Sequence, residues 1–390
     1  MGAKAGQLWT TRFPQIRMRR YPMGPGMIFI YILGAFGMGV AVWRWIVGLG
    51  PTTNLTDGRG WGLWIAFDMM AGIALAAGAF TVAATVYIFN LKRFYPIVRP
   101  AILTGFISYI LAGLTLLVDL GQPQRIWHLI IYWNIHSPLF EIGWCVMLYL
   151  TVLALEFSPV VFEWLGWKAP LKIIHTIQIP LIIAGVTLST MHQSTLGTML
   201  TALPERINAL WYSPLLPLYF FISAVAGGLG MTIFESFHSA RTYGYSFELG
   251  VLSRLAKAIP WVLGTYFVIR MGDVIINNKI QILLADGAPA LLFIIEMVGG
   301  VLLPLVMFAD PKVRNNMNGI TWAAFFTLGG VMINRIDNAL GFFAGGFYLP
   351  SWSELAVTIG LTCLGVIIYD LAVRFLPMFP EPTTKAEKEL

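Results

Sequence analysis

The sequence predicts an all-α polytopic membrane protein with ten transmembrane helices. Three observations support this class: 57% of the 390 residues are hydrophobic, only 11% are charged, and long apolar stretches fill most of the chain. A soluble domain carries about 25% charged residues, and a helix needs about 20 apolar residues to cross a bilayer. The composition therefore excludes a water-soluble globule, a disordered chain and a small disulfide-stapled domain. Membrane-spanning strands are not expected, because polarity does not alternate from residue to residue.

The ten helices are placed where Pro, Gly, Asn and charge clusters interrupt the apolar runs. In chain order we expect spans at 26–49, 61–89, 98–119, 137–157, 171–191, 213–235, 255–275, 288–309, 319–341 and 353–376. The first run is too long for the core of a signal peptide and should remain as an anchor. The predicted organisation is an N-terminal segment, a ten-helix membrane domain and a C-terminal tail, at 1–25, 26–376 and 377–390.

The distribution of Lys and Arg predicts the orientation. If the N-terminus is cytoplasmic, every cytoplasmic segment is enriched in the 25 Lys and Arg residues, as expected for loops that stay inside. Both termini should then face the cytoplasm, in a prokaryotic cytoplasmic membrane. This sidedness also explains the net charge of +6, so no nucleic-acid partner is inferred.

Ionisable residues in the second to fifth spans define the first candidate site. Each costs about 2.5–3.5 kcal/mol inside a membrane, so each needs a reason. Asp68 follows the start of the second span, Asp119 ends the third, Glu141 begins the fourth and His192 ends the fifth. The alternating direction of the helices places all four in the outer leaflet. We favour a functional role for Asp68, Glu141 and His192 together.

A second polar group lies in the sixth to ninth spans. Arg270 and Asp273 are three residues apart and can pair across one helical turn; we interpret them as a structural pair. The alternative is a proton path, for which the candidates are Asp273, Arg270, Glu296, Arg335, Asp337 and Glu235. The inner half of the helices is drier, which argues against a continuous file of polar side chains.

A membrane quinone is the substrate class that suits the first group. Each quinone carbonyl gains a proton and an electron on reduction, so a site needs a hydrogen-bond donor, a titratable group and apolar walls. Histidine supplies the donor, a carboxylate can carry protons, and aromatic side chains can wall the ring. The two cysteines, Cys145 and Cys363, are too few for an iron–sulfur cluster or a C-x-x-C-H haem site. No metal site is predicted.

Several short motifs resemble the NrfD/PsrC family, the membrane subunits of polysulfide-reductase-type complexes. These are Trp-Gly-Leu-Trp-Ile-Ala-Phe-Asp at 61–68, Val-Arg-Pro-Ala at 98–101, Ser-Pro-Leu-Phe-Glu at 137–141, Leu-Ala-Leu-Glu-Phe-Ser-Pro at 153–159 and Thr-Met-His-Gln-Ser-Thr-Leu-Gly at 190–197. The resemblance covers roughly residues 28–376 and favours the ten-span branch with the HybB, DsrP and HmcC subunits. Thr195 stands where Ser is common, which keeps the hydroxyl.

The resemblance implies two four-helix bundles, formed by helices 2–5 and 6–9, with helices 1 and 10 at the periphery. It also implies a menaquinone-reactive subunit of a respiratory oxidoreductase, used in anaerobic respiration and sulfur metabolism, with no haem or cluster of its own. Its electrons would pass through a ferredoxin-like iron–sulfur subunit on the extracytoplasmic face, in complexes that can include a multihaem cytochrome c and other membrane subunits. The quinone-site residues would be Glu141, His192, Asp68, Gln193, Trp64 and Asp119.

Two other functions are compatible with the sequence. One is a dihaem b-type cytochrome, although His175 and His192 are 17 residues apart on one helix, or about 25 Å. The other is a proton- or ion-translocating subunit without a redox role, because buried acids and an Arg–Asp pair suit an ion path.

Overall fold

The structure, a computed structural model, describes residues 23–56, 61–244, 248–285, 287–340 and 348–379. These segments are helical and contain no strand, so the predicted fold class is confirmed. Within them, nine helices are long and apolar enough to cross a membrane. The ninth predicted span is not among these nine; it corresponds to the 24-residue helix α16 (Met317–Leu340), whose C-terminal part carries four buried polar residues. Most of the two predicted tails lies outside the described residues.

The long helices follow the predicted spans in order. The first is α2 (Pro25–Val47), and the second is a broken helix of four pieces, η2 (Trp64–Ala71), α3 (Gly72–Leu75), α4 (Gly78–Ala83) and η3 (Ala84–Ile88). The remaining spans are α5 (Val98–Asp119), α7 (Pro138–Leu165), α8 (Lys168–Thr201), α9 (Leu216–Tyr243), α11 (Ile259–Ile276), the eighth span made of α13 (Ala288–Ile294), η7 (Ile295–Leu302) and α14 (Leu303–Ala309), then α16 and α17 (Trp352–Phe375). Short connecting helices are η1 (Gly50–Thr52), η4 (Lys92–Ile97), η5 (Pro123–Arg125), α6 (His128–Ile131), η6 (Pro204–Arg206), α10 (Leu249–Ala256), α12 (Ile280–Ala285) and α15 (Pro311–Arg314).

Three helices run well beyond their predicted ends at 157, 191 and 235. α7 and α9 stop only where Gly166 and Gly244 adopt left-handed conformations with φ of 70° and 69°, which end a helix without the penalty of a Cβ atom. α8 has 34 residues and is therefore about 51 Å long, against a hydrocarbon layer of about 30 Å. Its ends must project from the membrane.

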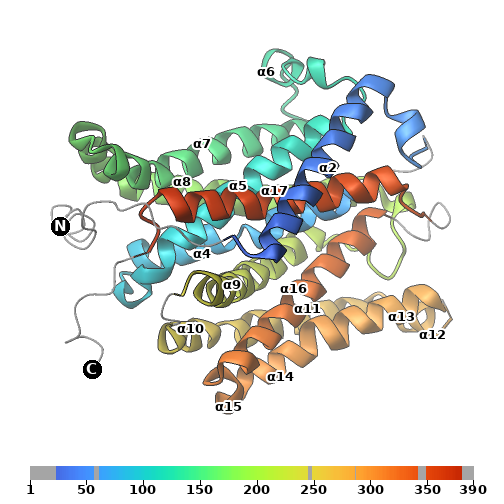
Figure 1. The fold of residues 1–390 in the computed structure, drawn as a ribbon. Coiled ribbons are helices and arrows are strands. Elements are labelled where there is room, and N and C mark those ends of the chain that lie inside the picture. Colours follow the sequence, from blue (N-terminus) through green and yellow to red (C-terminus); the bar gives the residue numbers. More distant parts are fainter. Residues whose placement is uncertain (1–22, 57–60, 245–247, 286, 341–347, 380–390) are drawn as a thin grey trace.

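The helices form two bundles and one peripheral pair (Figure 1). The second span, α5, α7 and α8 pack together, as do α9, α11, the eighth span and α16. The bundles meet where α9 contacts α8 and the second span. α2 and α17, the predicted first and tenth helices, cross one another and cover α5 and η2. This is the arrangement that the resemblance implies.

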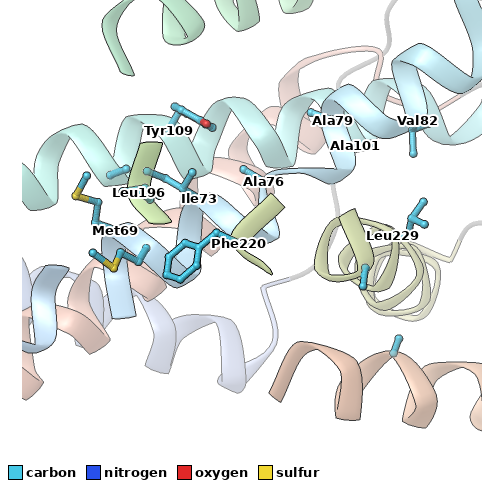
Figure 2. Packing of buried hydrophobic residues seen from close by; sticks show 14 of the residues in the cluster. Met69, Ile73, Ala76, Ala79, Val82, Ala101, Tyr109, Leu196, Phe220 and Leu229 are labelled. Atoms are coloured by element: carbon cyan, nitrogen blue, oxygen red, sulfur yellow. The ribbon is translucent and has the colours of Figure 1, made fainter. Parts of the chain in front are cut away.

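The second span lies at the centre of the molecule. Figure 2 shows Met69, Ile73, Ala76, Ala79 and Val82 on this span packed among residues of other helices, Ala101 and Tyr109 of α5, Leu196 of α8, and Phe220 and Leu229 of α9. Two of its pieces, η2 and η3, are π-helical, as is η7 in the eighth span. Single π-turns inside α-helices occur frequently at functional sites. The half-buried Asp68 lies in η2 and the buried Glu296 lies in η7, so both acids are on π-helical stretches.

Glycine pairs allow the closest helix crossings. A Cβ atom on Gly330 of α16 would lie 2.4 Å from the Gly300 Cα of η7, and one on Gly37 of α2 would lie 2.4 Å from the Gly360 Cα of α17. In a membrane the hydrophobic effect does not drive helices together, because lipid is as apolar as the side chains. Small residues at the interface let the helices approach closely, and van der Waals contacts then hold them together. These contacts fix the spacing within the second bundle and within the peripheral pair.

Candidate functional site

His192 is the centre of the candidate site. The side chain is fully buried on α8, and its ring packs edge-on against Tyr109 of α5, with 5.5 Å between centroids. The Tyr109 hydroxyl lies 3.4 Å from His192 Nδ1, and Tyr109 in turn packs edge-on against Tyr149 of α7 at 4.6 Å. His192 Nε2 is buried without a hydrogen-bond partner among the described residues. A buried polar atom in this state calls for an explanation, such as a missing ligand or water.

Glu141 is positioned by the first turn of α7. Ser137 caps this helix by accepting a hydrogen bond from the Phe140 amide at 3.4 Å, and Pro138 occupies the first helical position. Glu141 therefore lies in the first turn, where a negative charge is favourable. Its Oε1 accepts a 2.6 Å hydrogen bond from Thr195 Oγ1. Thr195 follows His192 by three residues, so the residue that holds the carboxylate lies about one helical turn from His192 on α8.

Gln193 adds a second unpartnered atom. Its side chain is fully buried, and Nε2 donates to the Ile73 carbonyl of the second span at 3.2 Å. Its Oε1 has no partner in the described part of the chain. His192 and Gln193 thus each carry one buried polar atom without a partner among the described residues.

The three other predicted site residues face a different part of the molecule. Asp68 Oδ2 accepts a 2.6 Å hydrogen bond from Thr358 of α17, and the Trp64 indole donates to the Glu354 carbonyl at 3.1 Å. Asp119 ends α5 near Arg44 of α2, whose guanidinium donates to the Leu120 carbonyl at 2.6 Å. No hydrogen bond between described residues links Asp68, Trp64 or Asp119 to Glu141 or His192. Asp68 thus bonds to α17, and the expectation that it lies beside Glu141 and His192 stays a prediction.

Glu296 is the centre of a hydrogen-bonded network in the second bundle. Its carboxylate accepts from the Trp211 indole at 2.8 Å and from Asn334 Nδ2 at 2.9 Å. Arg335 donates to Asn334 Oδ1 at 2.6 Å and to Ser223 at 2.9 Å, and its guanidinium lies 3.7 Å from the centroid of the Phe220 ring. Sequence reasoning singled out Glu296 and Arg335 but missed Trp211, Ser223 and Asn334, because uncharged polar residues are not conspicuous in an apolar run. Asp337 is buried on the same helix, and its Oδ2 has no partner among the described residues.

Asp273 is held by several neighbours. The predicted pair with Arg270 is present at 3.9 Å, but Lys279 is closer at 2.7 Å. Ser213 and Asn277 donate to the other carboxylate oxygen at 2.9 and 2.8 Å. Lys279 lies in the connection after α11; burial lowers the pKa of its amine, while the hydrogen bond to Asp273 acts in the opposite direction. The interpretation of Arg270 and Asp273 as a structural pair fits this fully partnered carboxylate.

Glu235 belongs to a third place, away from both groups. It accepts hydrogen bonds from Thr104 of α5 at 3.1 Å and from Tyr369 of α17. It lines a cavity of about 770 Å³ that Asp68 also lines, whereas Glu141 and His192 do not. No hydrogen bond between described residues joins Glu235 to Glu296 or Asp273, so the six candidates for a proton path do not form one connected file.

The histidines give a test of haem binding. Of the five in the sequence, only His192 is buried. A haem held between two helices by two histidines needs a second imidazole opposite the first, and the ring that packs against His192 is Tyr109. Within the described segments, no group of three or more His, Cys, Asp or Glu side chains could hold a metal ion. The described histidines therefore do not supply the pair of facing buried imidazoles that a haem between two helices needs.

Comparison with known proteins gives consistent matches along the chain. The family model described as "Polysulphide reductase, NrfD" matches residues 52–337. A protein of Nitratidesulfovibrio vulgaris Hildenborough is 35% identical over 372 residues, which cover 92% of this chain and 95% of the relative. The probable Ni/Fe-hydrogenase 2 b-type cytochrome subunit of Escherichia coli K12 is 34% identical over 364 residues, with 91% and 92% covered. The integral membrane subunit of menaquinone reductase from N. vulgaris is 28% identical over 391 residues, with 91% of each chain covered.

Proposed function

The chain belongs to the NrfD polysulphide reductase family, and on that premise we propose that it is the quinone-reactive membrane subunit of a respiratory redox complex. It would exchange electrons between menaquinone or menaquinol and an iron–sulfur partner on the predicted outer side. Two relatives support this assignment by name: one is a membrane subunit of a menaquinone reductase, and the other is a subunit of a hydrogenase.

The observation that carries the proposal is the unpartnered Nε2 of the buried His192, with Glu141 bonded to Thr195 one turn further along the same helix. Histidine tautomers are set by the hydrogen bond at the other ring nitrogen. The Tyr109 hydroxyl can donate to Nδ1, and this leaves the proton on Nε2. His192 therefore offers a hydrogen-bond donor in an apolar setting, which suits a quinone carbonyl.

Each residue of the site then has a distinct role. Menaquinone, when bound, supplies a carrier for two electrons and two protons. His192 would orient its ring by donating from Nε2, with Gln193 beside it. Glu141 would hold and release the proton at its carboxylate, and Thr195 keeps that carboxylate in place through the 2.6 Å hydrogen bond. Tyr109 holds the imidazole in the donating tautomer.

The predicted outer end of the molecule also offers a surface for the iron–sulfur partner. The connection between α5 and α7 leads directly to Glu141 and exposes large side chains, Trp127, Tyr132, Trp133 and Ile135. Aromatic rings are enriched where a protein meets the membrane interface. We place the docking of the partner here, close to the proposed quinone site, because electrons must enter near the ring.

Substitutions in the assembled complex test the proposal. Glu141→Gln should lower quinone-linked turnover by about 100-fold or more, the scale on which general acid–base groups act, and His192→Ala should have a comparable effect. Thr195→Val, which removes the hydrogen bond to Glu141, should slow turnover and shift its pH profile, while Thr195→Ser should retain both. Thr187→Val is the matched control, because Thr187 is exposed on the same helix and bonds only to its own backbone.

Assembly with the partner subunits should be checked for each variant by copurification. Turnover of Glu141→Gln and His192→Ala at the level of Thr187→Val, in complexes that assemble normally, would remove both residues from the mechanism. A haem b spectrum from the purified chain would instead support the cytochrome alternative.

A further inference from the structure

The large cavity of about 770 Å³ lies outside the proposed quinone site. Its walls come from α2, the second span, α5, α9, α16 and α17. At one end the lining includes Gly24 and Thr242, which are exposed. These two residues lie at the predicted cytoplasmic ends of α2 and α9, so the cavity opens on that side.

An apolar cluster closes the other end. Trp64 of η2 packs with residues of α2, α5 and α17, namely Val40, Ala41, Val118, Val357 and Leu361. Trp64 is one helical turn before Asp68 and is almost completely buried. Asp68 lines the cavity directly below this cluster. The cluster shares Leu361 with the lining of the cavity. We call it the Trp64 plug, the seal that a one-sided channel needs toward the opposite side of the membrane.

Polar groups follow the cavity from its mouth to Asp68. Near the mouth, Asp370 of α17 accepts from Arg374 at 2.7 Å and from Tyr243 of α9 at 3.0 Å. Further in, the Tyr369 hydroxyl contacts Ser239 at 2.9 Å and also donates to Glu235.

Beyond Glu235 the lining offers further hydroxyl groups. Thr104 donates to Glu235 at 3.1 Å, and Ser108 and Thr362 also line the wall. Asp68 follows, with its own bond to Thr358. The predicted dryness of the inner half thus does not hold along this face, where Glu235 and Asp370 meet hydroxyl groups of other helices that are inconspicuous in the sequence.

We propose that this cavity is a hydrated proton-access channel, which leads from the predicted cytoplasmic side through Glu235 to Asp68. A volume of 770 Å³ holds on the order of 20 water molecules; the acids and hydroxyls along one wall bond the waters nearest to them, and those waters bond to one another. Protons pass from water to the Glu235 carboxylate and on to Asp68, with no change in electron count. This inference depends on the proposed function in one respect: the reduction of the quinone is the reaction that would consume these protons.

The partners of the two acids suit proton transfer. Those of Glu235 and Asp68 are hydroxyl groups, which both donate and accept hydrogen bonds. The short bonds to Glu296 come instead from an indole and an amide nitrogen, which only donate. A proton can be handed along the first kind of partner and not along the second.

Cysteine labelling tests whether the channel holds water, and it does not depend on turnover. Thr362→Cys and Ser108→Cys are placed in a chain whose own Cys145 and Cys363 are replaced by Ala, and a membrane-impermeant thiol reagent is applied to each face of sealed vesicles containing the complex. Both cysteines should react from the predicted cytoplasmic face only. Thr327→Cys is the control that should stay unlabelled, because Thr327 is fully buried on α16 and does not line the cavity.

Labelling no faster than that of Thr327→Cys, or labelling from the opposite face, would overturn the proposal. If the cysteines stay unlabelled and a phospholipid copurifies with the protein, the cavity is a lipid site instead.

A second measurement tests proton delivery. Glu235→Gln and Asp68→Asn should each slow proton uptake from the cytoplasmic side by at least 10-fold during quinone-linked turnover in sealed vesicles. Glu235→Asp, which keeps a carboxylate, should recover part of the rate. Unchanged proton uptake in both amide variants would refute the channel even where Glu141→Gln abolishes turnover, so the two proposals can fail separately.

Discussion

The acids within the helices of this protein differ in the chemistry of their partners. Both oxygens of Asp273 and of Glu296 accept from nitrogen donors or a cation, and each acid also has a hydroxyl partner, Ser213 and Tyr266 respectively. Glu141 and Asp68 each have one close hydroxyl partner, and this leaves an oxygen free to exchange a proton. The partners therefore separate acids that stabilise the fold from acids suited to chemistry.

Among the partners of Asp273, Lys279 is the one whose substitution should lower the stability of the protein most. Lys279→Met removes the 2.7 Å ion pair and leaves Arg270 at 3.9 Å as the remaining cation. Removing one member of a buried pair typically costs about 3 kcal/mol or more, so we expect a clearly lower thermal-unfolding temperature in detergent. Lys257→Met, at an exposed position, is the control. Equal unfolding temperatures for the two variants would show that Arg270 alone satisfies Asp273.

At this scale the sequence predicted which residues are unusual and missed how they are grouped. Glu141 and His192 were placed at one level by counting along helices, and Thr195 links their positions. Asp68 shares that level but faces α17, because a helix can turn a residue in any direction. Tyr109 and Thr358 carry no charge and follow no spacing rule, so nothing in a single sequence marks them as partners.

The helices themselves were predictable because a bilayer imposes their length. Every predicted span has a helix at its place, and α5 matches 98–119. The ends of α7, α8 and α9 were not predictable, since outside the membrane hydropathy no longer limits a helix and local features such as Gly166 decide. The π-turns at Asp68 and Glu296 also leave no mark in a hydropathy pattern.

Adjacent glycines on α16 allow a test of helix packing. Gly330 faces Gly300 so closely that an added Cβ would clash, whereas nothing lies within 4 Å of a Cβ on Gly329. Gly330→Ala should destabilise the protein by about 1–3 kcal/mol through overpacking. Gly329→Ala should be neutral or slightly stabilising, because Ala favours a helix over Gly. The two are compared by thermal unfolding in the same detergent, and a similar loss in both would contradict the close crossing of α16 and η7.

At the scale of the whole molecule, ten spans require that both termini lie on one side. Reporter fusions can check this: green fluorescent protein at the C-terminus should fluoresce, and alkaline phosphatase inserted after Asn278, in the connection between the seventh and eighth spans, should be active. The reverse pattern would invert the predicted orientation and place the mouth of the cavity outside. If only one of the two reporters is active, both sites lie on the same side of the membrane, and this would contradict three spans between Asn278 and the C-terminus.

The two bundles differ in what they contain. The first holds the proposed quinone site, while the second contains the hydrogen-bonded networks around Glu296 and Asp273. The cavity lies against the peripheral pair α2 and α17, which also supply most of the Trp64 plug. The resemblance predicted this division, but hydropathy alone cannot indicate which faces of the helices enclose a space.

The one-sided cavity also changes how the membrane voltage is distributed. From Leu361 to Arg374 the lining of α17 runs 13 residues, or about 20 Å, which leaves roughly 10 Å of a hydrocarbon layer about 30 Å thick. Water in such a recess conducts, so the potential drops mainly across the thin insulating layer around Trp64. A charge at Asp68 then lies electrically near the cytoplasm, and the steepest field in the protein falls between that carboxylate and the opposite surface.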